Sequence, residues 1–197
     1  MIRRLMLTTA VLVLAACGAP EPEQTPGPAP VPTPPAPATD VLTAQGFGPL
    51  RIGMTRAEVE TALGADSNPD AVGGPDPASC DTFHPARAPQ GMMVMVEQGV
   101  LTSIWLDRGA TLKTDRGFGV GDAAAAIKAA YGPTATASPH KYAAAPAEYI
   151  TSWSVGGGAG YVQNASARGI TYHIGTDGRA EHVAAGGPSI QYVEGCA

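Results

Sequence analysis

The stretch LRIGMTRAEVETALG at residues 50–64 aligns without gaps with FGVGDAAAAIKAAYG at residues 118–132. Each stretch begins with a short apolar segment and a glycine, continues with a helix-forming segment, and ends at Gly64 or Gly132. Glycine is typical of the position after a helix because it adopts left-handed backbone angles without strain. The internal repeat predicts two similar structural units in the folded part of the chain.

Both expected helices carry a start signal. Thr55 and Glu58 have the spacing of a capping box, in which each side chain accepts a hydrogen bond from the other residue's backbone N–H. In the second stretch Asp122 is the expected N-cap, ahead of an alanine run that favours helix. Apolar residues four positions apart give each helix one apolar face: Val59 and Leu63 in the first, Ile127 and Tyr131 in the second.

Strand signals follow each expected helix, and turn residues separate them. The segments that favour strands are 80–84, 92–96, 100–106, 149–155, 170–174 and 179–183. Gln98-Gly99 and Asp177-Gly178 stand between consecutive segments, and an Asp-Gly pair is a strong hairpin signal.

We therefore expect an α+β fold with two repeated units. Each unit would be a short helix packed on an antiparallel sheet of about three strands. The first unit would cover residues 41–110 and the second residues 111–197. Because one such unit has a thin core, the two are expected to pack together.

The first stretch resembles a known family. Residues 52–59, IGMTRAEV, followed by Leu63-Gly64, are similar to the "GMT-x-x-x-V…LG" signature of the SmpA/OmlA (BamE-like) and beta-lactamase inhibitor protein group. The second stretch keeps the glycines and the apolar pair but lacks the Met and Thr. The resemblance implies a helix-and-sheet fold and a non-catalytic protein-binding role. It transfers no contact residues to this chain.

The amino-terminal segment has the three parts of an export signal, which we expect over residues 1–16. Arg3 and Arg4 are followed by an apolar run over residues 5–14 that is shorter than the ~20 residues of a membrane span. Leu14-Ala15-Ala16-Cys17 resembles a bacterial lipobox, which implies a lipid-anchored Cys17. By the same resemblance, Gly18 favours the outer membrane, facing the periplasm. The alternatives are a twin-arginine signal and an ordinary signal peptide with a chance cysteine.

Residues 17–40 form the expected linker after the anchor. Nine prolines over residues 18–40 favour an extended polyproline-type tether. It would either give the folded part reach toward a partner or act only as a generic spacer.

The remaining cysteines and the charge narrow the class of protein. Cys80 and Cys196 form an even pair in an oxidising compartment, which predicts a disulfide. The alternative, a catalytic or metal-binding pair, lacks a CxxC spacing. The formal charge is −5 and the twelve Lys and Arg residues are scattered, so nucleic-acid binding is not expected.

His173 and His182 are the candidates for a metal site. A two-residue turn at Asp177-Gly178 would place them opposite each other on neighbouring strands. The same register puts Tyr172, Ile174 and Val183 on the buried face, so the two histidines would face solvent. They are weak candidates, because zinc usually needs a third protein ligand and none is evident. We expect no metal and no cofactor.

Several other residues fit structural roles. His84 and His140 lie near prolines and are expected in loops, and residues 156–160 fit a glycine-rich hairpin loop. Large aromatics in strands are usually core, so we expect this of the three candidate binding anchors, Trp105, Trp153 and Tyr161. Residues 92–96 are apolar at both parities, which predicts a strand buried on both sides at the join between units.

These patterns predict a non-enzymatic envelope lipoprotein that binds another protein, as an assembly accessory or an enzyme inhibitor. The first alternative is a small-ligand or metal-binding periplasmic sensor that uses the surface around His173 and His182. The second is a hydrolase whose site matches no familiar motif. Membrane attachment through the lipid and one protein partner are the expected interactions.

Overall fold

A computed structural model describes residues 40–71 and 73–196. The expected signal segment, Cys17 and almost all of the proline-rich linker lie outside these described residues. Within them, no helix is both long enough and apolar enough to cross a membrane.

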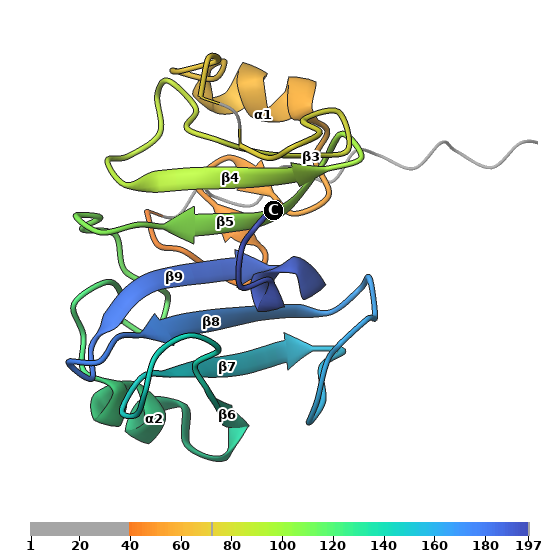
Figure 1. Cartoon of the computed structure of the whole chain (residues 1–197). Coiled ribbons are helices and arrows are strands. Elements are labelled where there is room, and N and C mark those ends of the chain that lie inside the picture. Colours follow the sequence, from red (N-terminus) through yellow and green to blue (C-terminus); the bar gives the residue numbers. More distant parts are fainter. Residues whose placement is uncertain (1–39, 72, 197) are drawn as a thin grey trace, which may run out of the picture. The chain divides into compact units, whose positions relative to one another are not determined.

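Among the described residues, seven antiparallel strands form one continuous sheet (Figure 1). In spatial order they are β3 (Cys80–Phe83), β4 (Met92–Glu97), β5 (Val100–Leu106), β9 (Ala180–Gly186), β8 (Arg168–Ile174), β7 (Glu148–Val155) and β6 (Ala135–Pro139). A separate two-stranded sheet pairs β1 (Gly46–Phe47) with β2 (Leu50–Arg51).

The expected fold class is wrong. The described residues are mostly sheet with two α-helices, and they do not form two repeated helix-on-sheet units. Strands β5 and β9 pair directly, from Ser103 opposite Gly186 to Leu106 opposite Val183. Two separate small sheets would each expose an edge of unpaired backbone groups at this position. Pairing β5 with β9 satisfies those groups and merges all strands into one sheet.

The first helix, α1 (Arg56–Leu63), begins as its sequence predicts. The Thr55 side chain accepts a hydrogen bond from the Glu58 N–H, and the Glu58 carboxylate accepts one from the Thr55 N–H at 2.7 Å. This confirms the capping box. Val59 on the inner face of the helix is fully buried.

The second helix, α2 (Ala124–Tyr131), begins differently from the prediction. Its N-cap is Ala123, which forms no side-chain cap, so the assignment of Asp122 as N-cap is wrong. The Asp122 carboxylate instead accepts hydrogen bonds from the Gly119 N–H and the Lys113 ammonium, each at 2.7 Å. The carboxylate orders the turn before the helix, and a short 3₁₀ helix, η1 (Gly132–Thr134), follows α2.

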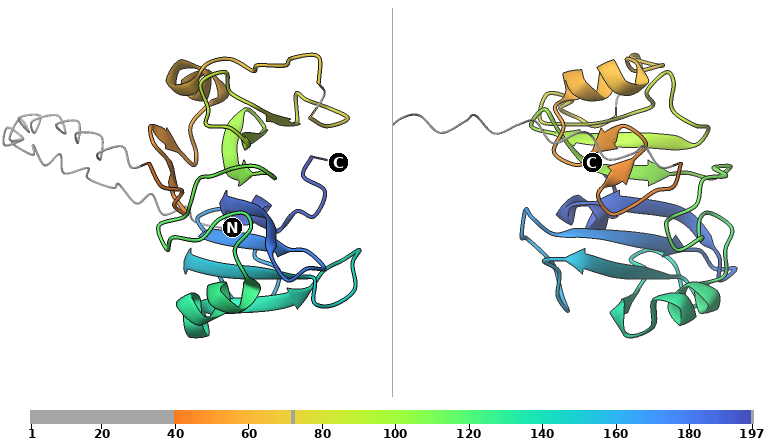
Figure 2. Two further views of the ribbon diagram at one scale, coloured as in Figure 1. Left: turned by 90° about the vertical axis from the view of Figure 1, so that its left-hand side faces the viewer. Right: turned by 180° about the vertical axis from the view of Figure 1, so that it is seen from behind.

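The hydrophobic core lies between one face of the sheet and the two helices. Val59 of α1 and Ile127 of α2 join the same buried cluster as Ile104 of β5 and Tyr172 of β8. The buried Tyr172 hydroxyl links elements within this cluster, since it lies 2.9 Å from both the Thr114 and the Tyr131 hydroxyls. Figure 2 shows both helices on one side of the sheet in its left view.

The opposite side of the sheet carries the C-terminal segment instead of α-helices (Figure 2, left view). The 3₁₀ helix η2 (Pro188–Gln191) contacts β5, β8 and β9 there. Beyond it, Cys196 forms a disulfide with Cys80 of edge strand β3, as the sequence predicts. The disulfide fastens the end of the chain across this side of the sheet.

The methionine-rich strand is buried as predicted but lies elsewhere than predicted. Met92, Val94 and Met95 of β4 are almost fully buried, so both parities of the strand are covered. However, β4 lies between β3 and β5, and the join between the two halves of the sheet is the β5–β9 pair. The placement of this strand at the join is therefore wrong.

Candidate functional site: the open face of the sheet

The face of the sheet without α-helices, called the open face below, displays two rows of directly paired side chains. Cross-strand register places Met93 opposite Trp105, Trp105 opposite Ala184, His182 opposite His173, and His173 opposite Tyr149. Alternate residues between these, such as Tyr172, belong to the core on the helix side. The open face thus displays aromatic, histidine and hydroxyl side chains.

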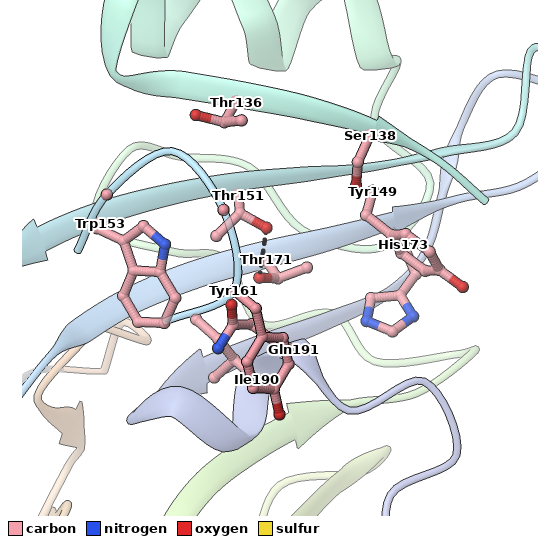
Figure 3. A pocket seen from close by; sticks show the side chains of 12 residues that line it. Thr136, Ser138, Tyr149, Thr151, Trp153, Tyr161, Thr171, His173, Ile190 and Gln191 are labelled. Atoms are coloured by element: carbon pink, nitrogen blue, oxygen red, sulfur yellow. Dashed lines mark hydrogen bonds between the residues drawn. The ribbon is translucent and has the colours of Figure 1, made fainter. Parts of the chain in front are cut away.

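One end of the open face is hollowed between β6, β7, β8 and the loop after β7. This β7–β8 hollow has a volume of about 310 Å³. Its lining combines hydroxyl, aromatic and small residues: Thr136, Ser138, Tyr149, Thr151, Trp153, Gly158, Gly160, Tyr161, Thr171, His173, Ile190 and Gln191. In Figure 3, Trp153 lies at one end of the hollow, Tyr149 and His173 lie at the other, and the Thr151–Thr171 pair lies between them.

The indole of Trp153 packs closely against two glycines. A Cβ atom on Gly157 would lie 2.0 Å from Trp153 Cγ, and one on Gly169 would lie 2.7 Å from Trp153 Cε3. No side chain fits at either position while the indole stays where it is. The glycine-rich loop at residues 156–160 follows β7, as the sequence predicts. Gly157 of this loop packs against the Trp153 indole.

The histidine pair predicted from the hairpin is present. His173 lies directly opposite His182, with ring centroids 6.1 Å apart. The turn differs from the prediction, because Ile174 pairs with Ala180 and the Gly175 N–H donates to the Arg179 carbonyl at 2.8 Å. A bulge between Ile174 and His173 then restores the predicted histidine register.

The prediction that both histidines face solvent is wrong for His173, which is 8% exposed. Its ring lies 5.3 Å from that of Trp105 and 4.9 Å from that of Tyr149. Burial is the main cause that lowers the pKa of His173 to about 3, and the nearby His182 and His140 rings act in the same direction. His173 is therefore a neutral side chain at neutral pH.

His182 is half-buried, and its Nδ1 lies 2.5 Å from the Asp107 carboxylate. Among residues 40–71 and 73–196, no group of three His, Cys, Asp or Glu side chains is arranged to hold a metal ion. Glu181, the neighbouring acid, pairs with Arg108 at 2.9 Å. The contact that the structure gives His182 is thus one carboxylate.

A second hollow of about 300 Å³ adjoins the first at His173. It lies between β4, β5 and the C-terminal segment, and Met93, Met95, Trp105 and His182 line it. The residues around the disulfide, 193–196, form its outer wall. The disulfide therefore shapes this part of the open face as well as closing the chain.

The three aromatic residues singled out in the sequence are not core. Trp105 and Trp153 are half-buried on the open face, and Tyr161 is 64% exposed in the loop between β7 and β8. The core interpretation failed because positions 105 and 153 have the parity that points away from the helices. Tyr149 is part of the same surface, and its sequence signal is the parity that it shares with Thr151 and Trp153.

The other two histidines follow strands, as expected. His84 comes directly after β3, and its Nδ1 lies 3.1 Å from the Met92 carbonyl oxygen. His140 comes directly after β6 and stacks on Tyr149 with ring centroids 4.7 Å apart. His140 thereby extends the aromatic row of the open face by one ring.

The open face has the geometry of a binding surface: fixed aromatic rings, neutral polar groups between them, and two adjoining hollows. No protein-family model, curated protein or solved structure matches this chain.

Proposed function

We propose that this chain is a non-catalytic binding protein that holds a protein partner on the open face. One observation carries the proposal. The large apolar side chains that stand out as exposed in the described residues are Tyr142 at 61%, Val155 at 54% and Tyr161 at 64%. All three belong to β7 or to the loops at its two ends. Tyr161 and the half-buried Trp153 line the same hollow, and adjoining exposed aromatic side chains of this kind mark interaction sites, whereas scattered ones are ordinary.

The chemistry of these residues suits a protein partner. Tyrosine and tryptophan dominate the energetics of protein interfaces because they bury a large area and keep one polar atom for a hydrogen bond. The half-buried Trp105 and Trp153 line the two adjoining hollows of the open face. A partner lying along the open face would meet ring after ring, with few charges to desolvate.

The family resemblance supports the same role. The IGMTRAEV stretch at residues 52–59 is similar to a group whose members bind other proteins and are not enzymes. We also propose the site of action: an outer-membrane lipoprotein, anchored through acyl chains on Cys17 and facing the periplasm. The Cys80–Cys196 disulfide supports an oxidising compartment, where such bonds persist.

Site-directed cross-linking in the native envelope tests the proposal. A photo-reactive amino acid replaces Tyr142 or Val155 in the full-length chain, and Thr61 on the exposed face of α1 is the matched control site. One partner cross-linked from both sites at the ends of β7 and absent from the Thr61 sample is the expected result. Equal labelling from all three sites, or none from Tyr142 and Val155, would contradict the proposal. A Cys17→Ser chain tests the anchor, since it should leave the membrane fraction.

The metal-sensor alternative has less support than protein binding. The described residues bring no third ligand to His173 and His182. The small-ligand alternative has a specific observation in its favour, the neutral β7–β8 hollow, which is taken up below.

A further inference from the structure

We infer that the β7–β8 hollow is a binding site for a neutral saccharide, taking one or two pyranose rings of a glycan. This goes beyond the proposed function, since a sugar site in the hollow requires no protein partner.

The charge of its lining limits the kind of ligand that the hollow accepts. Among the described residues that line the hollow, none is Asp, Glu, Lys or Arg. A charged ligand would lose hydration there and gain no opposite charge in return. The hollow therefore favours a ligand that is polar but carries no formal charge.

Hydroxyl side chains from three strands line the hollow. Thr136 and Ser138 line the hollow from edge strand β6, and Thr151 and Thr171 line it from β7 and β8. The Thr151 and Thr171 hydroxyls lie 2.9 Å apart and share one hydrogen bond. Since each hydroxyl has one proton and two lone pairs, this pair keeps further capacity for a ligand. Neutral donor and acceptor groups of this kind match the hydroxyls of a sugar.

Two aromatic side chains, Trp153 and Tyr161, also line the hollow. The indole of Trp153 packs directly on Gly157 and Gly169, where any side chain would collide with it. Figure 3 shows the ring of Tyr161 between Trp153 and His173 in that view. The π face of an aromatic ring is electronegative and attracts the weakly positive C–H groups of a flat sugar face. Rings beside hydroxyls thus offer both kinds of contact that a pyranose makes.

Size and composition separate this ligand from a peptide. A volume of about 310 Å³ is at the lower end of small-molecule sites, ~300–1,000 Å³. Aromatic grooves also accept proline-rich segments, and residues 26–38 of this chain are such a segment. A proline-rich segment offers mainly backbone carbonyl acceptors because proline has no N–H, whereas the hydroxyls of a saccharide both donate and accept. The row of threonine and serine hydroxyls therefore favours the sugar.

The test is direct binding by the full-length, disulfide-bonded protein in detergent. Neutral gluco-, galacto-, manno- and N-acetylglucosamine oligosaccharides are compared with uronic-acid oligosaccharides and with a synthetic peptide of residues 26–38. We expect saturable binding of at least one neutral series, followed by tryptophan fluorescence. Failure of every neutral series, preference for the uronic acids, or binding of the peptide alone would overturn the inference.

Variants then locate the site. Tyr161→Ser should weaken saccharide binding at least tenfold, and Tyr161→Phe should restore it to within threefold, because stacking needs the ring. Thr151→Val should weaken it about fivefold, and Thr61→Val on α1 should change nothing. Thermal unfolding checks that each variant folds. If the Tyr161 and Thr151 variants bind as the unmodified protein does, the sugar lies elsewhere and the hollow is not its site. Loss of the cross-linked partner at Tyr142 and Val155 with sugar binding intact would separate the two proposals.

Discussion

Replacing His173 by glutamine should remove much of the acid sensitivity of this fold. The imidazole is 8% exposed, between the Trp105 and Tyr149 rings. Burial lowers its pKa to about 3, with His182 and His140 acting in the same direction. In the unfolded chain the pKa returns to about 6.5, so the unfolded state binds the proton that the folded state rejects.

The sign and size follow from that difference. A histidine whose folded pKa is depressed stabilises the fold fully above the unfolded pKa, and this contribution is lost as pH falls from about 6.5 toward about 3. Between pH 7 and pH 5 the loss in unfolding free energy is about 2 kcal/mol. For a domain of this size, that is a fall in Tm of roughly 4–8 °C.

Urea unfolding at pH 7, 6 and 5 measures the effect. His173→Gln keeps a neutral hydrogen-bonding side chain and is expected to flatten the pH dependence by that amount, whatever its stability at pH 7. His84→Gln is the matched control, because His84 lies after β3 and outside the histidine cluster. Equal pH slopes for the unmodified protein and His173→Gln would refute the reasoning.

Three further predictions concern stability. Converting Cys80 and Cys196 to serine should lower the unfolding free energy by roughly 4–5 kcal/mol, because the bond closes a loop with a sequence separation of 116; an unchanged urea midpoint would contradict this. Thr55→Ala removes the capping box of α1 and should cost about 1 kcal/mol, whereas Thr61→Ala on the same helix should stay within about 0.5 kcal/mol; equal costs would argue against the cap. Tyr172→Phe leaves two buried hydroxyls without their shared partner and should cost about 1–3 kcal/mol by thermal unfolding; a neutral result would show that the chain of hydroxyls does not stabilise the core.

Local signals in the sequence were reliable where the physics is local. The Thr55–Glu58 capping box forms because both partners lie within one helical turn. The histidine register of the β8–β9 hairpin was correct because alternation along both strands restricts the pairing, even with a different turn. By contrast, Asp122 was misassigned because Lys113, nine residues earlier, binds its carboxylate.

The candidate site was predicted only in pieces. Residues 171–173 alternate in polarity but residues 149–153 do not, so the sequence does not indicate which face of β7 is covered. Trp105 and Trp153 are assigned to the core from their hydrophobicity. Their alternate positions in the strands point away from the core, but only the location of the helices shows which positions those are. The burial of His173 likewise depends on neighbours from β5 and β7, which are far apart in the chain.

The start of α1, most of the strand segments, the histidine pair and the Cys80–Cys196 pairing were therefore determined by the sequence alone. The tertiary structure decided the rest: the merging of the strands through β5 and β9, the placement of both helices on one face, and the open face that results. Local patterns depend on residues a few positions apart, which a linear sequence displays. The pairing of β5 with β9 joins residues about eighty positions apart, and no local pattern encodes which free strand edges will meet.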